Sequence, residues 1–283
     1  MLGRVLFPSF CLSLTSLILS CAAKNNAQPD DYLNKARELI QVQQFQAAKL
    51  YVDSVRIKFP TDFAKIREGL GVIREINFAE QKRTLAFCDS MLKVRQDELP
   101  AAQKSFVFEK NAEYESIGHY VYKSQTQTIG RTFLQTKVDE KGHLILTSYY
   151  AGGAALNHTS IRATANDGSY AESLVVPKDG ALNYSFRDGG TRYEIVRFNQ
   201  KAENGVVNFV LSNENKPITL TLMGGKTKAY RISTNDRQAM KAAADLSVIL
   251  TDINRLLSEM RLSQAKMDYI FKKQESERMA SDS

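Results

Sequence analysis

The spacing of apolar residues changes twice along the chain and divides it into three segments. Over residues 30–104, apolar residues recur every three or four positions, which predicts amphipathic helices. Over residues 105–233 they alternate with polar residues, and from residue 234 the helical spacing returns without glycine or proline. We therefore predict an α+β fold. It has N-terminal helical hairpins, a central antiparallel β meander or sandwich, and a long C-terminal helix that packs back on the N-terminal helices.

The helical segment opens with two short amphipathic stretches. Asp30 or Asp31 is expected to cap the first helix, and a longer helix is expected from Phe63 until Pro100 stops it. Residues 30–62 resemble a tetratricopeptide-type helical hairpin, with small residues where the two helices cross, through Tyr32, Ala36, Leu39, Ala48, Val52 and Pro60. One such hairpin cannot bury its own apolar face, so it is expected to pack on another part of the chain.

Turn-forming residues recur at short intervals over residues 105–233, and the runs between them alternate. These runs predict about ten short strands joined by tight turns. The clearest are Leu182-x-Tyr184-x-Phe186, Tyr193-x-Ile195, Val207-x-Phe209-x-Leu211 and Ile218-x-Leu220-x-Leu222. Gly224-Gly225-Lys226-Thr227 looks like the end of a phosphate-binding loop, but alternating residues rather than a helix follow it, which indicates a hairpin turn.

A long helix is predicted over residues 234–278. Ser233 and Asp236 form a capping-box pattern at its start. A heptad-like seam follows, made of Ala239, Ala243, Leu246, Leu250, Ile253, Leu257, Met260, Gln264, Met267 and Phe271. We expect this seam to pack on the first helical segment, which needs a partner; a homodimeric coiled coil is the alternative.

The first twenty residues have the layout of a secretory signal. Arg4 precedes an apolar run that is too short to span a bilayer, and the run ends in Ile18-Leu19-Ser20-Cys21. This ending resembles the lipobox of bacterial lipoproteins. The resemblance implies that residues 1–20 are removed and that Cys21 is acylated and becomes the anchor, with residues 21–29 as a tether. An ordinary signal peptide cut after Ala23 is the alternative.

The same resemblance implies a location. Inner-membrane lipoproteins of enterobacteria-like hosts have Asp directly after the lipidated Cys, where this chain has Ala22. Surface-exported lipoproteins of Bacteroidetes-like bacteria have an acidic cluster there, whereas the first acids here are Asp30 and Asp31. We therefore expect an envelope protein on the outer membrane that faces the periplasm.

The charge of the chain argues against a nucleic-acid partner. The formal net charge is +7, and most of the excess lies over residues 117–233, where lysines and arginines are scattered singly along predicted hairpins. Nucleic-acid binders concentrate such residues in clusters, and an exported protein does not meet nucleic acid.

Residues that carry chemistry are few. The three histidines, His119, His143 and His158, have no metal-ligand spacing, so we expect no metal, no cofactor and no catalysis, and all three histidines to be dispensable. His158 follows the glycine- and alanine-rich residues 151–157, which are expected to form a connecting loop. Cys88 lies on an apolar helical stripe, which predicts a buried thiol.

Tyrosines are concentrated in the β segment and suggest a binding surface. Exposed tyrosine beside arginine can anchor a protein partner or stack on a sugar ring. The candidate surface residues are Tyr149, Tyr150, Tyr170, Tyr184, Tyr193 and Arg192. We expect a lipid-anchored envelope protein that docks another envelope protein or scaffolds a complex, with a glycan- or lipid-binding β module as the alternative.

Cys21→Ala is expected to abolish metabolic labelling of the protein with a fatty acid, because the acyl anchor needs the thiol. The variant should stay soluble or unprocessed. Cys88→Ala is the matched control and should be labelled like the natural chain. Equal labelling of the Cys21→Ala variant would contradict the lipoprotein prediction.

Overall fold

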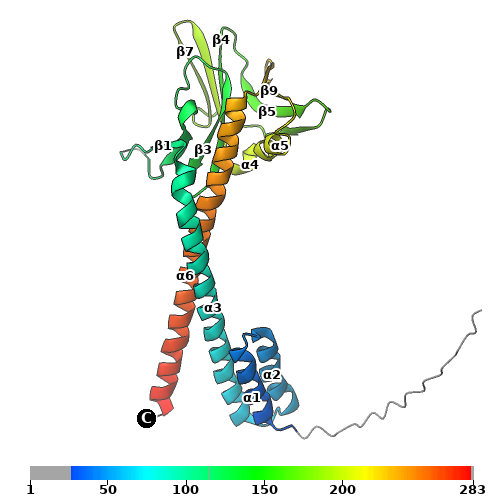
Figure 1. Ribbon diagram of the computed structural model, residues 1–283, viewed down its shortest axis with the longest axis vertical. Coiled ribbons are helices and arrows are strands. Elements are labelled where there is room, and N and C mark those ends of the chain that lie inside the picture. Colours follow the sequence, from blue (N-terminus) through cyan, green and yellow to red (C-terminus); the bar gives the residue numbers. More distant parts are fainter. Residues whose placement is uncertain (1–26, 114, 282–283) are drawn as a thin grey trace, which may run out of the picture. The chain divides into compact units, whose positions relative to one another are not determined.

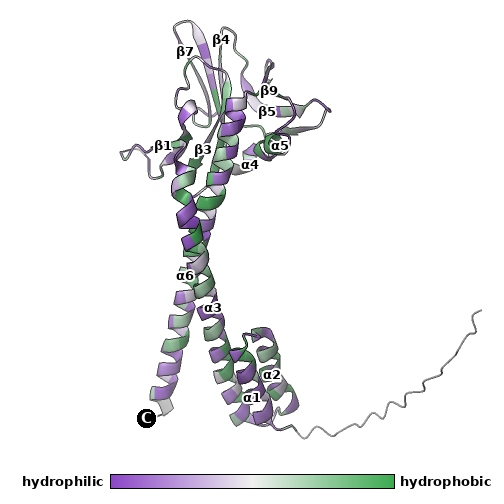
Figure 2. Ribbon diagram, in the orientation of Figure 1, coloured by the Kyte–Doolittle hydropathy of each residue, from purple (hydrophilic) through white to green (hydrophobic). Residues whose placement is uncertain are grey.

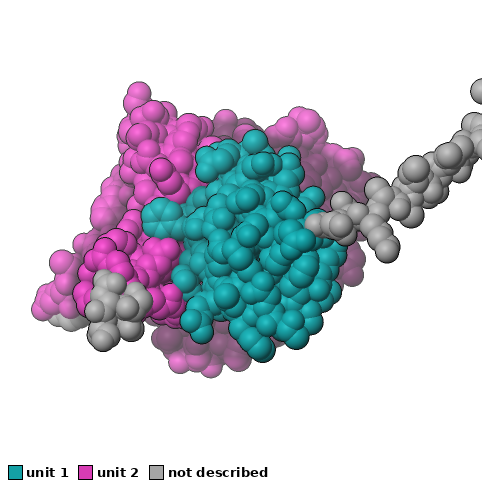
Figure 3. Space-filling model, turned by 90° about the horizontal axis from the view of Figure 1, so that it is seen from below, with its two compact units in different colours: residues 1–79 teal, residues 80–283 magenta. Residues whose placement is uncertain are grey.

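A computed structural model of the chain describes residues 27–113 and 115–281. The predicted signal at residues 1–20 and the anchor Cys21 lie outside the described residues. The chain divides within its third helix into two compact units, residues 1–79 and 80–283 (Figure 3). Each unit has its own hydrophobic core.

The described residues form helices at both ends of the chain and strands in the middle (Figure 1). The helices are α1 (Pro29–Gln41), α2 (Phe45–Lys58), α3 (Phe63–Gln103), α4 (Gln200–Glu203), α5 (Val206–Ser212) and α6 (Thr234–Ser281), with the 3₁₀ turn η1 (Lys123–Gln125). The strands are β1 (Phe106–Glu109), β2 (His119–Tyr122), β3 (Phe133–Asp139), β4 (Leu144–Gly152), β5 (His158–Ala165), β6 (Tyr170–Glu172), β7 (Asn183–Asp188), β8 (Thr191–Phe198), β9 (Ile218–Gly224) and β10 (Lys228–Arg231).

The first unit is a three-helix cluster made of α1, α2 and the first part of α3. Ala36 and Ala48 are fully buried, which lets α1 and α2 approach closely, and Val72 and Ile76 of α3 close the core. The first helix begins at Pro29 with Gln28 as its N-cap, so the prediction that Asp30 or Asp31 caps it is wrong and both lie in its first turn. The Asp31 carboxylate accepts the N–H of Gln28 at 2.7 Å.

Pro100 does not end α3, contrary to the sequence expectation. The helix continues to Gln103 with Pro100 inside it. Proline costs a helix one backbone hydrogen bond, and tertiary packing offsets that loss here. Leu99 and Ala102, on either side of Pro100, pack against the cluster around Phe106 and Leu246.

Two antiparallel sheets form the β part of the second unit, as predicted. The strand order is β1-β2-β3-β4-β8-β7 in the six-stranded sheet and β10-β9-β5-β6 in the four-stranded sheet. Leu146 and Phe198 of the first sheet share one buried cluster with Ile161 and Leu220 of the second. The two sheets therefore pack face to face at β4 and β8, as in a sandwich.

Residues 206–212 form helix α5, and the predicted strand Val207-x-Phe209-x-Leu211 is wrong. Val206, Val207 and Val210 are buried at helical spacing in the main core. Asn204 and Gly205 have positive φ angles of 52° and 82°, which turn the chain before α5 begins. A short apolar run fits both a strand and a buried helix, so its period alone did not decide between them.

Helix α6 packs on the second half of α3 and on the sheet, as predicted. Ala243 and Leu246 contact the sheet cluster with Val138, and Leu256 packs on Cys88 and Leu92 of α3. Ser233 caps α6, because its hydroxyl accepts the N–H of Asp236 at 3.1 Å. No helix within residues 27–113 and 115–281 has an apolar stretch long enough to cross a bilayer.

The apolar seam of α6 departs from the predicted heptad after Ile253. Leu256, Ser263 and Ile270 are buried, whereas Leu257, Gln264 and Phe271 are exposed. Two successive three-residue steps, from Leu250 through Ile253 to Leu256, move the buried stripe by one position. Figure 2 shows hydrophobic and hydrophilic residues recurring along this helix.

Leu256→Ala is expected to lower the free energy of unfolding by about 2–5 kcal/mol, because it leaves a cavity between α3 and α6. The neighbouring residue Leu257 is the matched control, because it is 40% exposed whereas Leu256 is 1% exposed. Leu257→Ala should cost less than about 1 kcal/mol. Urea unfolding followed by circular dichroism measures both values, and equal losses would contradict the shifted seam.

Candidate functional site

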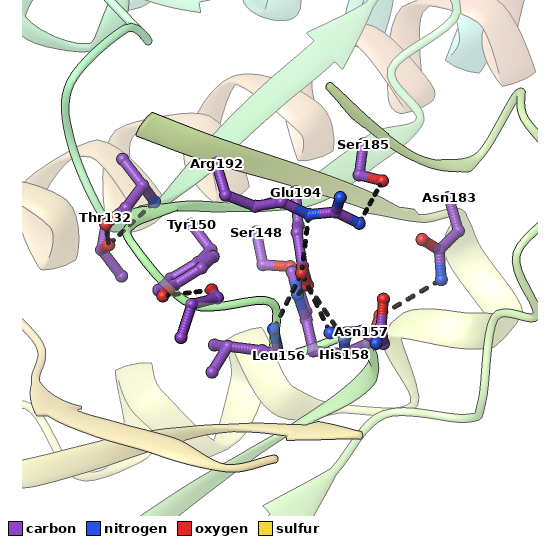
Figure 4. Close-up of polar contacts among 12 residues, drawn as sticks. Thr132, Ser148, Tyr150, Leu156, Asn157, His158, Asn183, Ser185, Arg192 and Glu194 are labelled. Carbon is purple, nitrogen blue, oxygen red and sulfur yellow. Dashed lines mark hydrogen bonds and ion pairs between the residues drawn. The ribbon is translucent and has the colours of Figure 1, made fainter. Parts of the chain in front are cut away.

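A buried polar cluster connects the two sheets, with Ser148, His158 and Glu194 at its centre and the Arg192 guanidinium 3.5 Å from the Glu194 carboxylate at its edge (Figure 4). Ser148 lies on β4 and Glu194 on β8, both on the inner side of the six-stranded sheet, and His158 is the first residue of β5 in the other sheet. The Ser148 hydroxyl is 2.7 Å from His158 Nε2, and His158 Nδ1 is 2.9 Å from Glu194 Oε2. Because a carboxylate only accepts, Nδ1 carries the proton.

The carboxylate of Glu194 accepts hydrogen bonds from three backbone N–H groups as well as from the His158 ring. Oε1 accepts the backbone N–H groups of Leu156 and Asn157, both at 2.9 Å, and Oε2 accepts that of His158 at 3.1 Å. Burial raises the pKa of Glu194, but the bonds from the His158 ring and these N–H groups outweigh burial and lower the pKa to about 2. Glu194 is therefore a buried anion at neutral pH.

The connection before β5 is held at several points, whereas the sequence suggested a plain loop. Tyr150 donates its hydroxyl to the carbonyl of Ala154 at 2.8 Å, and the N–H of Lys226 bonds the carbonyl of Leu156 at 3.0 Å. Gly224 lies against the backbone of this connection, and a Cβ atom added to Gly224 would be 2.1 Å from the carbonyl oxygen of Asn157. His158 is 1% exposed, so the expectation that it can be dispensed with conflicts with its burial beside an anion.

A small pocket of about 140 Å³ opens beside the cluster. His158, Glu194, Asn183 and Ser185 are among its lining residues, and Asn183 donates to the carbonyl of Val176 at 2.8 Å. The order serine–histidine–carboxylate matches that of serine hydrolases. However, Ser148 is fully buried and does not line this pocket. A nucleophile has to contact its substrate, so the geometry favours a cluster that joins the sheets.

Sequence reasoning missed this cluster because Ser148, His158 and Glu194 have no motif spacing. One signal was present. Glu194 alternates with Val196 and Phe198, which places a carboxylate on the apolar side of its strand. A carboxylate at such a position needs buried donors, and the segment before β5 supplies them.

The opposite side of the six-stranded sheet carries a row of aromatic residues. Phe133, Tyr149, Ile195 and Tyr184 are cross-strand neighbours on β3, β4, β8 and β7. The rings of Phe133 and Tyr149 stack at 5.0 Å between centroids, and those of Phe186 and Tyr193 stack at 5.0 Å beside them. We call Phe133, Tyr149, Tyr184, Phe186 and Tyr193 the aromatic face.

The aromatic face brings together three of the six predicted surface residues, namely Tyr149, Tyr184 and Tyr193. The prediction of a surface position is wrong for Tyr150 and Tyr193, which are buried, at 4% and 9% exposure. Tyr150 and Arg192 lie on the inner side of the same sheet, where Arg192 donates to Ser185 at 2.8 Å. Tyr170 lies on β6 of the other sheet, with the Arg162 guanidinium 4.7 Å from its ring centroid.

Local interactions fix the rings of the aromatic face. The Arg131 guanidinium lies 4.5 Å from the Phe133 ring centroid, and the Tyr149 hydroxyl donates to Gln135 at 3.2 Å. Burial, together with the neighbouring Tyr184, raises the pKa of Tyr149 to about 12. The Tyr149 hydroxyl is therefore a neutral donor at physiological pH.

The described residues offer neither a metal site nor an accessible thiol. Within the described part of the chain, no group of three or more His, Cys, Asp or Glu side chains is arranged to hold a metal ion. Cys88 is a free thiol and is 3% exposed, which confirms its predicted burial. Its neighbours are Leu92 and Leu256, so it belongs to the packing between α3 and α6.

No protein-family model matches this sequence, and no curated protein matches it either. What the fold and the site define is an α+β protein with a β sandwich joined by a buried carboxylate and a long helix packed on it. A function has to be inferred from this chain's own residues.

Glu194→Gln is expected to lower the free energy of unfolding at pH 7 by about 3–5 kcal/mol, because an amide places donors against the buried N–H groups. Glu172→Gln is the control. It weakens a partly exposed pair with Arg162 and should cost less than about 1 kcal/mol. Urea unfolding of both variants at pH 7 measures the difference.

The contribution of Glu194 should also depend on pH with a defined sign. Its pKa is about 2 in the fold against an ordinary value of 4.5, so its stabilisation is complete above about pH 4.5 and is lost as the pH falls towards 2. Over that window the natural chain should lose more stability than the Glu194→Gln variant. Parallel pH profiles would contradict the role of the buried anion.

Proposed function

We propose that this protein is a lipid-anchored protein of the cell envelope that docks another protein through the aromatic face, without catalysis. The observation that carries the proposal is the row of stacked aromatic side chains on the outer side of the six-stranded sheet. Phe186 is exposed and Tyr149 and Tyr184 are half-buried, and these three rings form the accessible part of the row, whereas Phe133 and Tyr193 are buried beneath it. The inner side is already used, since α6 and the four-stranded sheet pack there.

The aromatic face suits a protein partner. Aromatic side chains bury a large area and lose little conformational entropy, so they dominate the energetics of many interfaces. Phe186 is 44% exposed although it stacks on Tyr193, which leaves one side of its ring for a partner. Regular strands hold these rings, so binding orders little of the chain.

The charge around the aromatic face favours an acidic partner. Arg131 lies over Phe133 at one end of the row, and the β segment carries most of the net positive charge of the chain. A protein segment that combines apolar and acidic side chains would complement both features.

A glycan is the less favoured occupant. Sugar-binding surfaces rely on tryptophan, and the chain has none. The lipid anchor at Cys21 remains part of the proposal, with the protein on the periplasmic side of the outer membrane.

A photo-crosslinking amino acid at position 184 is expected to capture a specific envelope protein in cells, because Tyr184 lies within the aromatic face. The captured protein should bind the purified natural chain. Phe186→Ala should weaken this binding at least tenfold, since truncation of an aromatic anchor costs about 2 kcal/mol or more.

Tyr269→Ala is the matched control, since Tyr269 is an aromatic residue of α6 and is 66% exposed. It should leave the binding unchanged. Equal binding of the Phe186→Ala and Tyr269→Ala variants would contradict docking through the aromatic face. Crosslinking at position 184 to polysaccharide alone would favour the glycan-binding alternative.

A further inference from the structure

A larger cavity of about 550 Å³ lies at one end of the sandwich, apart from the buried polar cluster. Its floor is apolar and belongs to the fringe of the main core, through Leu144, Val176, Leu182 and Ala202. Leu174 and Val175, which directly precede Val176 in the chain, are 50% and 66% exposed. The volume is within the range of small-molecule sites.

The walls of this cavity are held by backbone hydrogen bonds. The segment between β6 and β7 is bound to β5 through Val176 N–H and the Thr159 carbonyl at 2.8 Å. The same segment is bound to α4 through Leu174 N–H and the Ala202 carbonyl at 2.8 Å. Leu182 accepts the backbone N–H of Arg197 at 2.8 Å, which ties the segment to β8. The cavity is therefore formed before any ligand arrives.

The rim of the cavity is cationic. Arg197 and Lys201 line it, and both are exposed. Asp139 also lines the cavity, but its carboxylate is occupied. It accepts the N–H groups of Lys141 and His143 at 2.8 Å and lies 2.9 Å from His143 Nδ1.

We propose that this cavity binds an aliphatic carboxylate, such as a medium-chain fatty acid. The acyl tail lies on the floor formed by Leu144, Val176 and Leu182, and the carboxylate is bound by Arg197 and Lys201. A bound tail removes apolar surface from water, and the guanidinium offers paired donors to a carboxylate. This site shares no lining residue with the aromatic face, although Arg197 is directed to the same side of β8 as Tyr193 and Ile195.

The head group is a singly charged carboxylate rather than a phosphate. Two cations oppose one occupied carboxylate, Asp139, at the rim, so the excess positive charge is small. A doubly charged phosphate would meet stronger repulsion from Asp139 than a monoanion does. A sugar would leave the apolar floor without a complementary surface.

Isothermal titration calorimetry with decanoate tests the head group. The full chain with Cys21→Ala is used, so that no acyl chain of its own competes, and decanoate stays below its critical micelle concentration. We expect saturable binding of one decanoate. The double variant Arg197→Gln/Lys201→Gln should bind at least tenfold more weakly. Lys226→Gln/Lys228→Gln, which removes two exposed lysines of the β9–β10 turn, should bind like the parent.

The tail is tested by filling the cavity. Ala202→Phe should abolish decanoate binding, with a thermal unfolding curve as the check on folding, and Ala265→Phe on an exposed position of α6 is its control. Methyl NMR signals of Leu144, Val176 and Leu182 should shift on addition of decanoate to the Cys21→Ala chain, whereas those of Val248 and Leu262 should not. This measurement needs no cavity variant.

The outcomes separate the two proposals. Absence of saturable binding, equal affinity of the two double variants, or shifts spread evenly over both sets of methyl groups would overturn the fatty-acid site. None of these results bears on Phe186, which is on the docking face. Loss of partner binding in the Phe186→Ala variant, in turn, leaves the decanoate titration unaffected.

Discussion

The buried carboxylate of Glu194 is the interaction on which the β part of the molecule depends. It belongs to one sheet, and it accepts four hydrogen bonds from Leu156, Asn157 and His158 at the start of the other. An anion in an apolar core is tolerated only where donors surround it, so the donors have to stay where they are. The crossing from β4 to β5 is thereby fixed, and with it the face that each sheet presents to the other.

That constraint also decides which side chains lie on the other side of the six-stranded sheet. Neighbouring residues of a strand point to opposite sides. With Ser148 and Glu194 directed inward, Tyr149, Tyr193 and Ile195 are directed outward and meet Phe133 and Tyr184 across the strands. The inner side is divided between two covers, since the four-stranded sheet packs on β4 and β8 and α6 packs towards β2 and β3. The aromatic face therefore lies on the side of the six-stranded sheet that neither α6 nor the four-stranded sheet covers.

The periodicity of the sequence predicts the architecture well and the site poorly. Local sequence patterns predict the change from helical to alternating spacing and the cap at Ser233. They also predict that the long helix packs back on the first helical segment. Val207 to Leu211 and the shifted seam at Leu256 are not, because packing partners far along the chain decide them. Ser148, His158 and Glu194 meet only through the pairing of the sheets. The parity of the strands could have divided the predicted surface, since Tyr149 and Tyr150, or Arg192 and Tyr193, cannot share a side.

Strand β8 shows how one element serves stability and binding at once. Its inward residues Glu194, Val196 and Phe198 belong to the core and to the polar cluster, its outward Tyr193 belongs to the aromatic face, and Arg197 near its end lines the larger cavity. A substitution at an outward position changes a surface and leaves the donors of Glu194 in place, whereas one at an inward position removes either apolar packing or the anion. Because neighbouring residues of β8 point to opposite sides, the outward residues can vary while the buried carboxylate keeps the two sheets in register. The two roles stay separate because β8 is a rigid, central strand.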